Sequence, residues 1–193
     1  MDNDSRRAEF VAAANELYRE QGIRHTSILD IAQRVGVTRS LFYHYFPDKQ
    51  AVTDAVIEMR INEFMAYVRE WTSQLDGVDI QEALKRLSGM ARSFLRGPDS
   101  FISCAARDQD HYLTRRFVVR GSNLLADYFV RTRNENGSPV RLTNARHPRE
   151  AFYVLSVGIM SIMTQDPAVT DDVIADLIID TLHISRKAVG YKK

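Results

Sequence analysis

The chain contains very little cysteine and has no long apolar run. Its single cysteine, Cys104, excludes a disulfide within the chain, as is usual for proteins of a reducing compartment. No stretch approaches the ~20 apolar residues that a membrane-spanning helix needs. The opening residues, MDNDSRRAEF, lack the apolar core of a signal peptide. We therefore expect a cytoplasmic protein that does not associate with membranes.

Positive charge is not in excess. The 193 residues include 26 Lys and Arg against 25 Asp and Glu, and the first 50 residues carry seven of each sign. Overall charge therefore gives no indication of a nucleic-acid partner. If the chain binds DNA, its basic side chains must gather on one face while the acidic ones face away, and the affinity should fall as salt rises.

Alternating polar and apolar residues, the mark of a strand, are not found. Apolar residues instead recur at intervals of three and four, which predicts an all-α protein. The helices are expected at about 5–21, 27–35, 39–45, 48–71, 101–106, 110–132, 149–164 and 170–189, with a further helix around 84–94.

The most specific local pattern is TSILDIAQRVGVTRSLFYHYF, residues 26–46. It predicts two short helices, the first capped by Thr26, on either side of a turn that contains Gly36. Glycine readily adopts the left-handed conformation that redirects the chain sharply, and the small Ala32 lets the helices cross closely. This is the arrangement of a helix-turn-helix, whose second helix enters a DNA major groove. A plain three-helix packing unit with solvated polar residues is the alternative that the spacing alone leaves open.

Three further patterns fall in register around this segment. They are AAxxLYxxxG at 13–22, TSxxDIAxxxGVT at 26–38 and FYxxFxxK at 42–49. Together they make residues 10–56 closely resemble the N-terminal domain of the TetR family of bacterial transcriptional regulators. The resemblance implies an N-terminal three-helix helix-turn-helix domain, joined by a long fourth helix to a C-terminal helical ligand-binding and dimerisation domain. We expect these domains at 4–64, with the motif at about 27–46, and at 65–193.

The resemblance also implies which side chains lie at or near DNA. Arg39 has the chemistry to read a guanine edge, whereas Tyr43 and Lys49 match positions that meet backbone phosphates. The full predicted set is Thr26, Ser27, Thr38, Arg39, Ser40, Leu41, Tyr43, His44 and Lys49. Leu29 and Leu41 depart from the polar residues that are frequent at their positions, although Leu41 can pack against a thymine methyl group.

The last two predicted helices are apolar over much of their surface. In the family such helices form a two-fold bundle, and a dimer agrees with paired operator half-sites. The expected interface residues are Leu155, Gly158, Ile159, Ile162, Leu177 and Ile178. Core packing within one chain is the alternative for any of them.

A ligand pocket is expected among the fourth to eighth helices. Arg116 and Arg120 lie one turn apart and can grip an anionic ligand, although a solvated basic face is the plainer interpretation. The remaining candidates are large apolar residues, each of which core packing also explains. They are Phe64, Met65, Val68, Trp71, Leu87, Met90, Phe94, Phe101, Tyr112 and Phe117.

These observations predict a repressor that a largely apolar small molecule releases from a palindromic operator. An activator or a ligand-independent regulator of the same fold is the first alternative, and a helical-bundle metal enzyme is the second. The pairs Asp108/His111 and Asp180/His183 have helical spacing suited to a metal, but no inward set of carboxylates accompanies them. We expect no catalytic residues, no metal and no cofactor.

Overall fold

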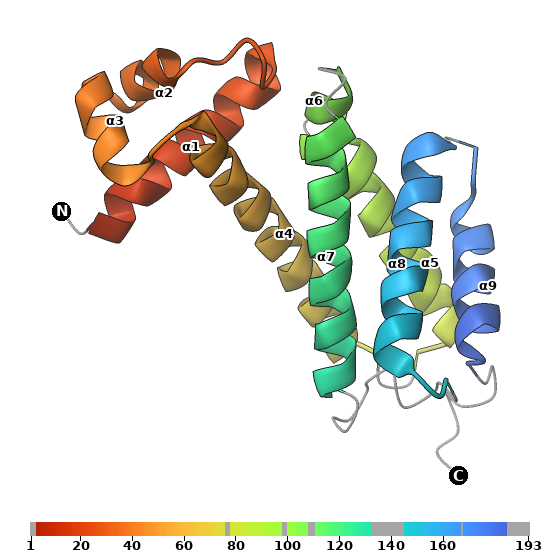
Figure 1. Ribbon diagram of the computed structural model, residues 1–193. Helices are drawn as coiled ribbons and strands as arrows, with labels where there is room; N and C mark the ends of the chain where they lie inside the picture. Colours follow the sequence, from red (N-terminus) through yellow and green to blue (C-terminus); the bar gives the residue numbers. More distant parts are fainter. Residues whose placement is uncertain are drawn as a thin grey trace. The chain divides into compact units, whose positions relative to one another are not determined.

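The computed structural model describes residues 3–75, 78–97, 100–107, 111–132, 145–166 and 168–184. Within these ranges the regular structure is helical and contains no strand, which confirms the predicted all-α class (Figure 1). The search for a helix long and apolar enough to span a membrane found none among them. The helices are α1 Asn3–Gln21, α2 Ile28–Val35, α3 Arg39–Tyr45, α4 Lys49–Ser73, α5 Ile80–Arg96, α6 Phe101–Arg107, α7 His111–Arg131, α8 Pro148–Gln165 and α9 Asp171–Leu182.

Two helix ends differ from the expectation. The residue that caps α2 is Ser27, not Thr26. The last helix was expected to reach residue 189, but α9 ends at Leu182 because His183 adopts the left-handed conformation, with φ 51°. The amide of Ile184 then donates to the carbonyl of Ile179, which closes the helix end.

The chain divides into two compact units, and the first comprises Met1–Asn62 with Pro98–Thr114. In this unit α1 packs against α2 and α6, and α2 packs against α3. Its centre is aromatic: the Phe10 ring meets Phe42 edge-on at 5.4 Å and Phe46 at 6.3 Å between centroids. All three rings are almost fully buried. The stretch 98–114 lies outside the N-terminal domain expected at 4–64.

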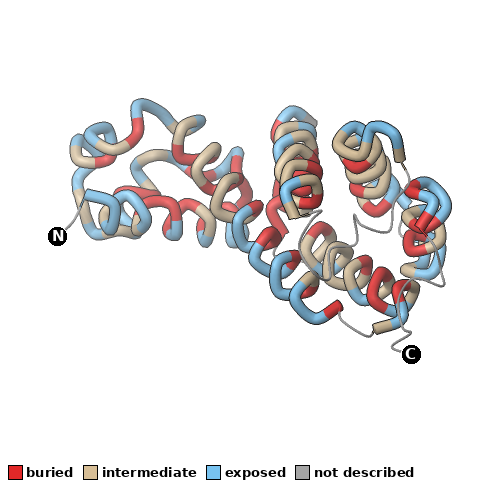
Figure 2. The backbone as a smooth tube through the Cα atoms, turned by 90° about the horizontal axis from the view of Figure 1, so that it is seen from below, coloured by how far each residue is buried: buried red, intermediate tan, exposed pale blue. Residues whose placement is uncertain are grey.

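The second unit comprises Glu63–Gly97 and Arg115–Lys193. Here α5 packs against both α8 and α9, and α8 packs against α9. Buried and exposed positions alternate along each helix, so that each buries one face (Figure 2). At the start of α9, Asp171 accepts hydrogen bonds from Nε and Nη2 of Arg92 at 3.0 and 2.7 Å. Such partly exposed pairs add little stability each, but they hold α5 and α9 in register.

Candidate nucleic-acid interface and ligand pocket

The turn between α2 and α3 is built by local hydrogen bonds. Ser27 and Asp30 form a capping box, in which the Asp30 amide donates to Ser27 Oγ at 3.1 Å and the Ser27 amide donates to Asp30 Oδ2 at 2.7 Å. Gly36 follows α2 in the left-handed conformation, with φ 76°. A side chain there would meet no atom within 4 Å, so the requirement for glycine comes from the backbone.

Helix α3 is held from behind by the aromatic core of the first unit. Phe42 has no exposed surface and packs against Phe10 and Phe46. Because one side of the helix is anchored in this way, its other side faces solvent. The predicted DNA-contacting residues that are exposed are Ser27, Thr38, Arg39, Ser40, Tyr43 and His44, whereas Leu41 is half-buried.

Two of these exposed side chains form a pair. The Arg39 Nη2 donates to the Tyr43 hydroxyl at 2.9 Å, and the guanidinium carbon lies 5.5 Å from the centre of the Tyr43 ring. They are one helical turn apart, so both reach the same side of α3. The pair presents a positive charge and an aromatic hydroxyl together on the solvent side of the helix.

Thr26 is a correction to the predicted interface. Its side chain is only 1% exposed, and its hydroxyl donates to the carbonyl of Gly22 at 2.7 Å. The hydroxyl therefore closes the end of α1 and cannot touch DNA without rearrangement. The sequence pattern misled because Thr26 and Ser27 are both good capping residues, and only Ser27 caps α2.

Lys49 lies at the start of α4 and is half-buried. Its Nζ donates to the carbonyl of Ile23 at 2.5 Å. Next to it, Thr53 donates to the Lys49 carbonyl and shares a 2.7 Å hydrogen bond with the buried hydroxyl of Tyr18. Burial raises the pKa of Tyr18 to about 12. These contacts tie the first turn of α4 to α1.

Three acidic residues of the first unit form ion pairs or hydrogen bonds with nearby groups. Arg34 on α2 bonds to Glu16 at 3.2 Å and to Glu20 at 2.5 Å, both on α1. The hydrogen bond from Arg34 lowers the pKa of Glu20, and the backbone amide of Ser27 lowers the pKa of Asp30. These carboxylates are therefore occupied on α1 and at the start of α2, away from the exposed positions of α3.

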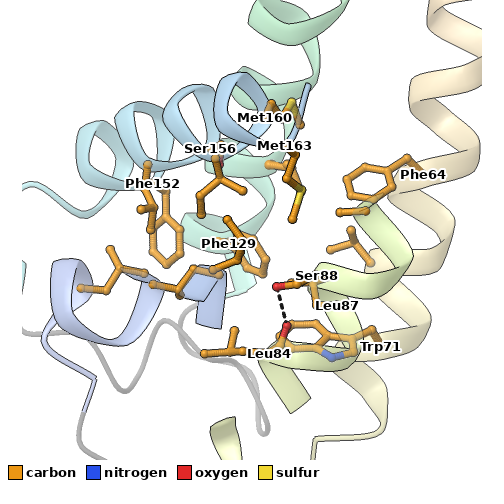
Figure 3. A pocket seen from close by; sticks show the side chains of 18 of the residues that line it. Phe64, Trp71, Leu84, Leu87, Ser88, Phe129, Phe152, Ser156, Met160 and Met163 are labelled. Carbon is orange, nitrogen blue, oxygen red and sulfur yellow. Dashed lines mark hydrogen bonds between the residues drawn. The ribbon is translucent and has the colours of Figure 1, made fainter. Parts of the chain in front are cut away.

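The second unit contains a cavity that is partly open to solvent and encloses about 760 Å³ of space, solvent-exposed space included (Figure 3). Helices α4, α5, α7, α8 and α9 supply its walls, and α6 supplies none, which corrects the expectation of a pocket among the fourth to eighth helices. The side chains that line it are almost all apolar. They are Phe64, Val68, Trp71, Leu84, Leu87, Ser88, Ala91, Leu95, Leu125, Phe129, Phe152, Leu155, Ser156, Ile159, Met160, Met163, Ile174, Ile178, Leu182 and Ile184.

Four of the expected pocket residues line this cavity: Phe64, Val68, Trp71 and Leu87. The others do not, for different physical reasons. Phe101 and Tyr112 belong to the first unit, and Tyr112 is 63% exposed. The remainder lie on the right helices but outside the lining. They are Met65, Met90, Phe94, Arg116, Phe117 and Arg120.

Phe94 and Phe117 explain how size can mislead. They stack on each other at 6.0 Å between centroids, and Phe94 also contacts the ring of Phe64 at 5.0 Å. These two large rings therefore fill the space between their own helices, and only Phe64 reaches the cavity. The size of an apolar residue indicates that it belongs to the core. It does not indicate whether the residue packs against other side chains or lines a cavity.

The residues expected at a dimer interface divide into two groups. Leu155, Ile159 and Ile178 line the cavity of their own chain, and each is half-buried. Gly158, Ile162 and Leu177 do not line it, and Ile162 and Leu177 are each 38% exposed.

Two exposed valines extend the second group. Val154 on α8 is 67% exposed and Val173 on α9 is 47% exposed. Val154, Gly158 and Ile162 follow one another at intervals of four, and so form one stripe along α8. That spacing was visible in the sequence, but the apolar residues on the other sides of α8 obscured it.

The two Asp/His pairs do not assemble a metal site in the described residues, where no suitable cluster of ligands is found. His183 follows the end of α9 in the left-handed conformation and so leaves the helical face on which Asp180 stands. Asp108 of the other pair lies outside the described residues.

Comparison with known families tests the helix-turn-helix directly. Residues 10–56 match the family described as "Bacterial regulatory proteins, tetR family". This segment is therefore a tetR-type N-terminal domain. The matched segment runs from Phe10 of the aromatic core to Val56 of α4, and so includes the whole of α2 and α3. This confirms the resemblance noted in the sequence.

Curated relatives are similar over part of the chain. The transcriptional repressor KstR2 of Rhodococcus jostii RHA1 is 29% identical over 82 residues, which are 42% of this chain and 39% of that protein. The transcriptional regulator HbdR of Aromatoleum sp. CIB is 33% identical over 75 residues, which are 39% of this chain and 31% of that protein. The matches thus span less than half the length of either relative. Both relatives are named as helix-turn-helix regulators, which supports a regulator rather than an enzyme.

Solved structures extend the likeness in fold to most of the chain. The repressor AlkX of Dietzia sp., implicated in biodegradation of n-alkanes, superimposes with a TM-score of 0.66 at 20% identity, covering 92% of this chain and 96% of AlkX. RolR in complex with resorcinol gives a TM-score of 0.65 at 15% identity, covering 98% of this chain and 97% of RolR. At such identities the likeness shows the fold alone.

Proposed function

We propose that the chain is a sequence-specific transcriptional repressor, which an apolar small molecule releases from a palindromic operator. The observation that carries this proposal is the exposed polar face of α3, held in place by the buried ring of Phe42. A helix anchored on one side and polar on the other suits a major groove. Since its target is DNA, the protein would act in the cytoplasm of a bacterium.

The exposed residues of α3 have separate roles in this proposal. Arg39 reads a base edge, and Tyr43 holds a phosphate. Lys49 adds charge at the start of α4, although its hydrogen bond to Ile23 also gives it a structural role. Ser27, Thr38, Ser40, Leu41 and His44 complete the surface. We place this function in residues 4–64, and ligand binding and dimerisation in 65–193.

The experiment is to select bound fragments from random DNA and then titrate the selected operator. Arg39→Ala should weaken binding by ~1–3 kcal/mol and relax the preference at one base position. Arg69→Ala is the matched control, because Arg69 is an exposed arginine on the part of α4 that belongs to the second unit. No sequence preference in the wild type, or an unchanged preference in Arg39→Ala, would refute the proposed role of this surface.

The proposed dimer uses the outer stripes of α8 and α9. Exposed apolar residues lie two turns apart on α8, at Val154 and Ile162, and one turn apart on α9, at Val173 and Leu177, which suits a helical interface. Two copies related by a two-fold axis would present two α3 helices to half-sites ~34–36 Å apart.

Gly158 provides a test of this interface. A Cβ added at Gly158 meets no atom within 4 Å in the single chain, so Gly158→Phe adds a side chain with no clash at Cβ. It should nevertheless disturb the dimer. Light scattering at micromolar concentration should find a wild-type dimer and a weakened Gly158→Phe dimer, and a wild-type monomer with and without operator would contradict the proposal.

Release by a ligand is proposed from the cavity and from the continuity of α4. One helix runs without a break from Lys49, tied to α1, to Trp71 in the cavity wall. A ligand pressing on the last turns of α4 would bias the position of its first turn. A coupling of ~1–3 kcal/mol changes operator affinity about 5–150-fold, and the operator must weaken ligand binding by the same factor.

A further inference from the structure

The wall of the cavity carries no charge. Of the twenty side chains that line it, seventeen are wholly apolar, and the polar groups are the hydroxyls of Ser88 and Ser156 and the indole N–H of Trp71. Part of the cavity's space is open to solvent. The ligand must therefore find nearly all of its contacts on carbon and sulfur atoms.

Two of the three polar groups are already in use. The Trp71 N–H donates to the carbonyl of Ala83 at 2.8 Å, and the Ser88 hydroxyl donates to the carbonyl of Leu84 at 2.8 Å, the dashed line in Figure 3. Ser156, on α8, makes no side-chain hydrogen bond with any residue that the structure describes. Its hydroxyl is thus the group of the wall that remains able both to donate and to accept.

Among the described residues, no basic side chain lines the cavity, and three on the lining helices bond elsewhere. Arg92 on α5 is paired with Asp171, and Arg96 donates to the carbonyl of Met163 at 3.2 Å. Arg149 on α8 bonds to Asp127 of α7 at 2.8 Å. A carboxylate or ammonium ion in this cavity would lose its water without gaining a partner of opposite charge, which strongly disfavours binding.

We propose that the cavity takes an electrically neutral ligand with an apolar body and one hydrogen-bonding group, and that Ser156 selects this group. The inference deepens the proposed function and rests on it for the ligand's role as a releaser of DNA. It replaces the expected grip of Arg116 and Arg120 on an anion, since neither residue lines the cavity. An alcohol, ketone or ester oxygen satisfies Ser156 and leaves no unpaired charge.

Trp71 makes a direct test possible, because it is the only tryptophan in the sequence and lies in the cavity wall. A bromine atom quenches tryptophan fluorescence at short range. A ligand that carries bromine therefore lowers the fluorescence of Trp71 when it enters the cavity. We would titrate the full-length protein at pH 8 with ω-bromoundecanol, ω-bromoundecanoate and ω-bromoundecylammonium. The alcohol should bind at least ~10-fold more tightly than either ion.

The role of Ser156 is tested with Ser156→Ala and a probe that lacks the hydroxyl, 1-bromoundecane. Loss of one hydrogen bond should weaken the binding of the alcohol by about 2–12-fold and leave the binding of the bromoalkane unchanged. Ser161→Ala is the matched control, because Ser161 lies on the same helix but does not line the cavity. It should bind both probes as the wild type does. Thermal melts of each variant, compared with the wild type, establish that the fold is intact.

Three results would overturn the inference. They are binding of either ion as tight as that of the alcohol, equal weakening of the alcohol and the bromoalkane in Ser156→Ala, and no quenching by the alcohol up to its solubility limit. Operator release is measured separately. If quenching follows the predicted order but no bound probe changes operator affinity, the switching function fails while the ligand class stands.

Discussion

The candidate sites of the two units arise from the sequence in different ways. In the first, two features of the proposed DNA-binding surface follow from neighbours in sequence, since Ser27 caps α2 and Gly36 makes the turn. Phe42, which anchors α3, also packs against Phe10 of α1. In the second, the cavity is made by five helices whose lining residues span 64–184. Interactions between residues close in sequence determine much of the surface. The cavity depends on where helices distant in sequence leave the space between them unfilled.

The largest expected effect tests whether the first unit is tightly packed and the second is open. Phe42→Ala removes a fully buried ring from the aromatic core and should cost ~3–5 kcal/mol of unfolding free energy. Leu87→Ala, in the half-buried cavity wall, should cost only ~1 kcal/mol, since the side chain already lacks neighbours on one side. Urea denaturation measures both. Equal losses would show that the cavity wall is packed as tightly as the core.

Alkaline pH should affect the first unit through Tyr18. Between its ordinary value near 10 and its folded pKa of about 12, the unfolded chain loses the tyrosine proton while the folded chain keeps it. The free energy of unfolding should therefore be unaffected by this group below pH 10 and fall by up to ~2–3 kcal/mol as the pH rises to 12.

The matched variants isolate that contribution. Tyr18→Phe should be less stable than the wild type at pH 7 by about 1 kcal/mol, because Thr53 loses its partner, and should lack this alkaline decline. Tyr67→Phe, at an exposed tyrosine, should follow the wild-type curve. Denaturation series at pH 7, 10 and 11.5 decide, and an equal decline in Tyr18→Phe would contradict the assignment.

Gly36 tests the claim that the turn is local. Gly36→Ala forces a side chain into the left-handed conformation and should cost ~1–2 kcal/mol, although no atom obstructs the added methyl group. Gly36→Asn should cost less, because asparagine tolerates this conformation better. If thermal or urea unfolding ranks the two variants in the opposite order, the glycine is required for contacts rather than for its backbone.

The smallest effect concerns the pair of Arg39 and Tyr43. Tyr43→Phe removes the hydroxyl that accepts from Arg39, and with it the phosphate contact that we propose. A double-mutant cycle on operator binding with Arg39→Ala should give a coupling of ~0.5–1 kcal/mol. A coupling of zero would mean that DNA separates the two side chains and that each acts alone.

The helices and the turn were predictable because the decisive signals lie within a few residues of one another. Gly36 and the three-to-four spacing required no knowledge of distant parts of the chain, whereas the packing of Phe42 on the distant Phe10 was not predicted. Even there, Thr26 was misassigned, because two adjacent capping residues compete and only the three-dimensional end of α1 determines which one is buried.

The cavity was predictable only in part. Phe64, Val68, Trp71 and Leu87 were identified, but Phe94 and Phe117 stack on each other instead of facing an opening. Nothing in a single helix's pattern distinguishes a residue that meets another side chain from one that meets empty space. The sequence likewise did not indicate that Leu155 and Ile159 line the cavity, since an apolar helix does not reveal which of its sides faces its own chain.

Helix α8 turns one stripe toward the cavity, with Leu155, Ser156 and Ile159, and another outward, with Val154 and Ile162. Many positions of α8 therefore belong either to the cavity wall or to the exposed apolar stripe. A change in ligand preference made on this helix therefore risks altering the outer face as well. Divergence among descendants of this protein should accumulate on the opposite wall, at positions such as Leu87 and Ala91 of α5, and redesign for a new inducer should begin there.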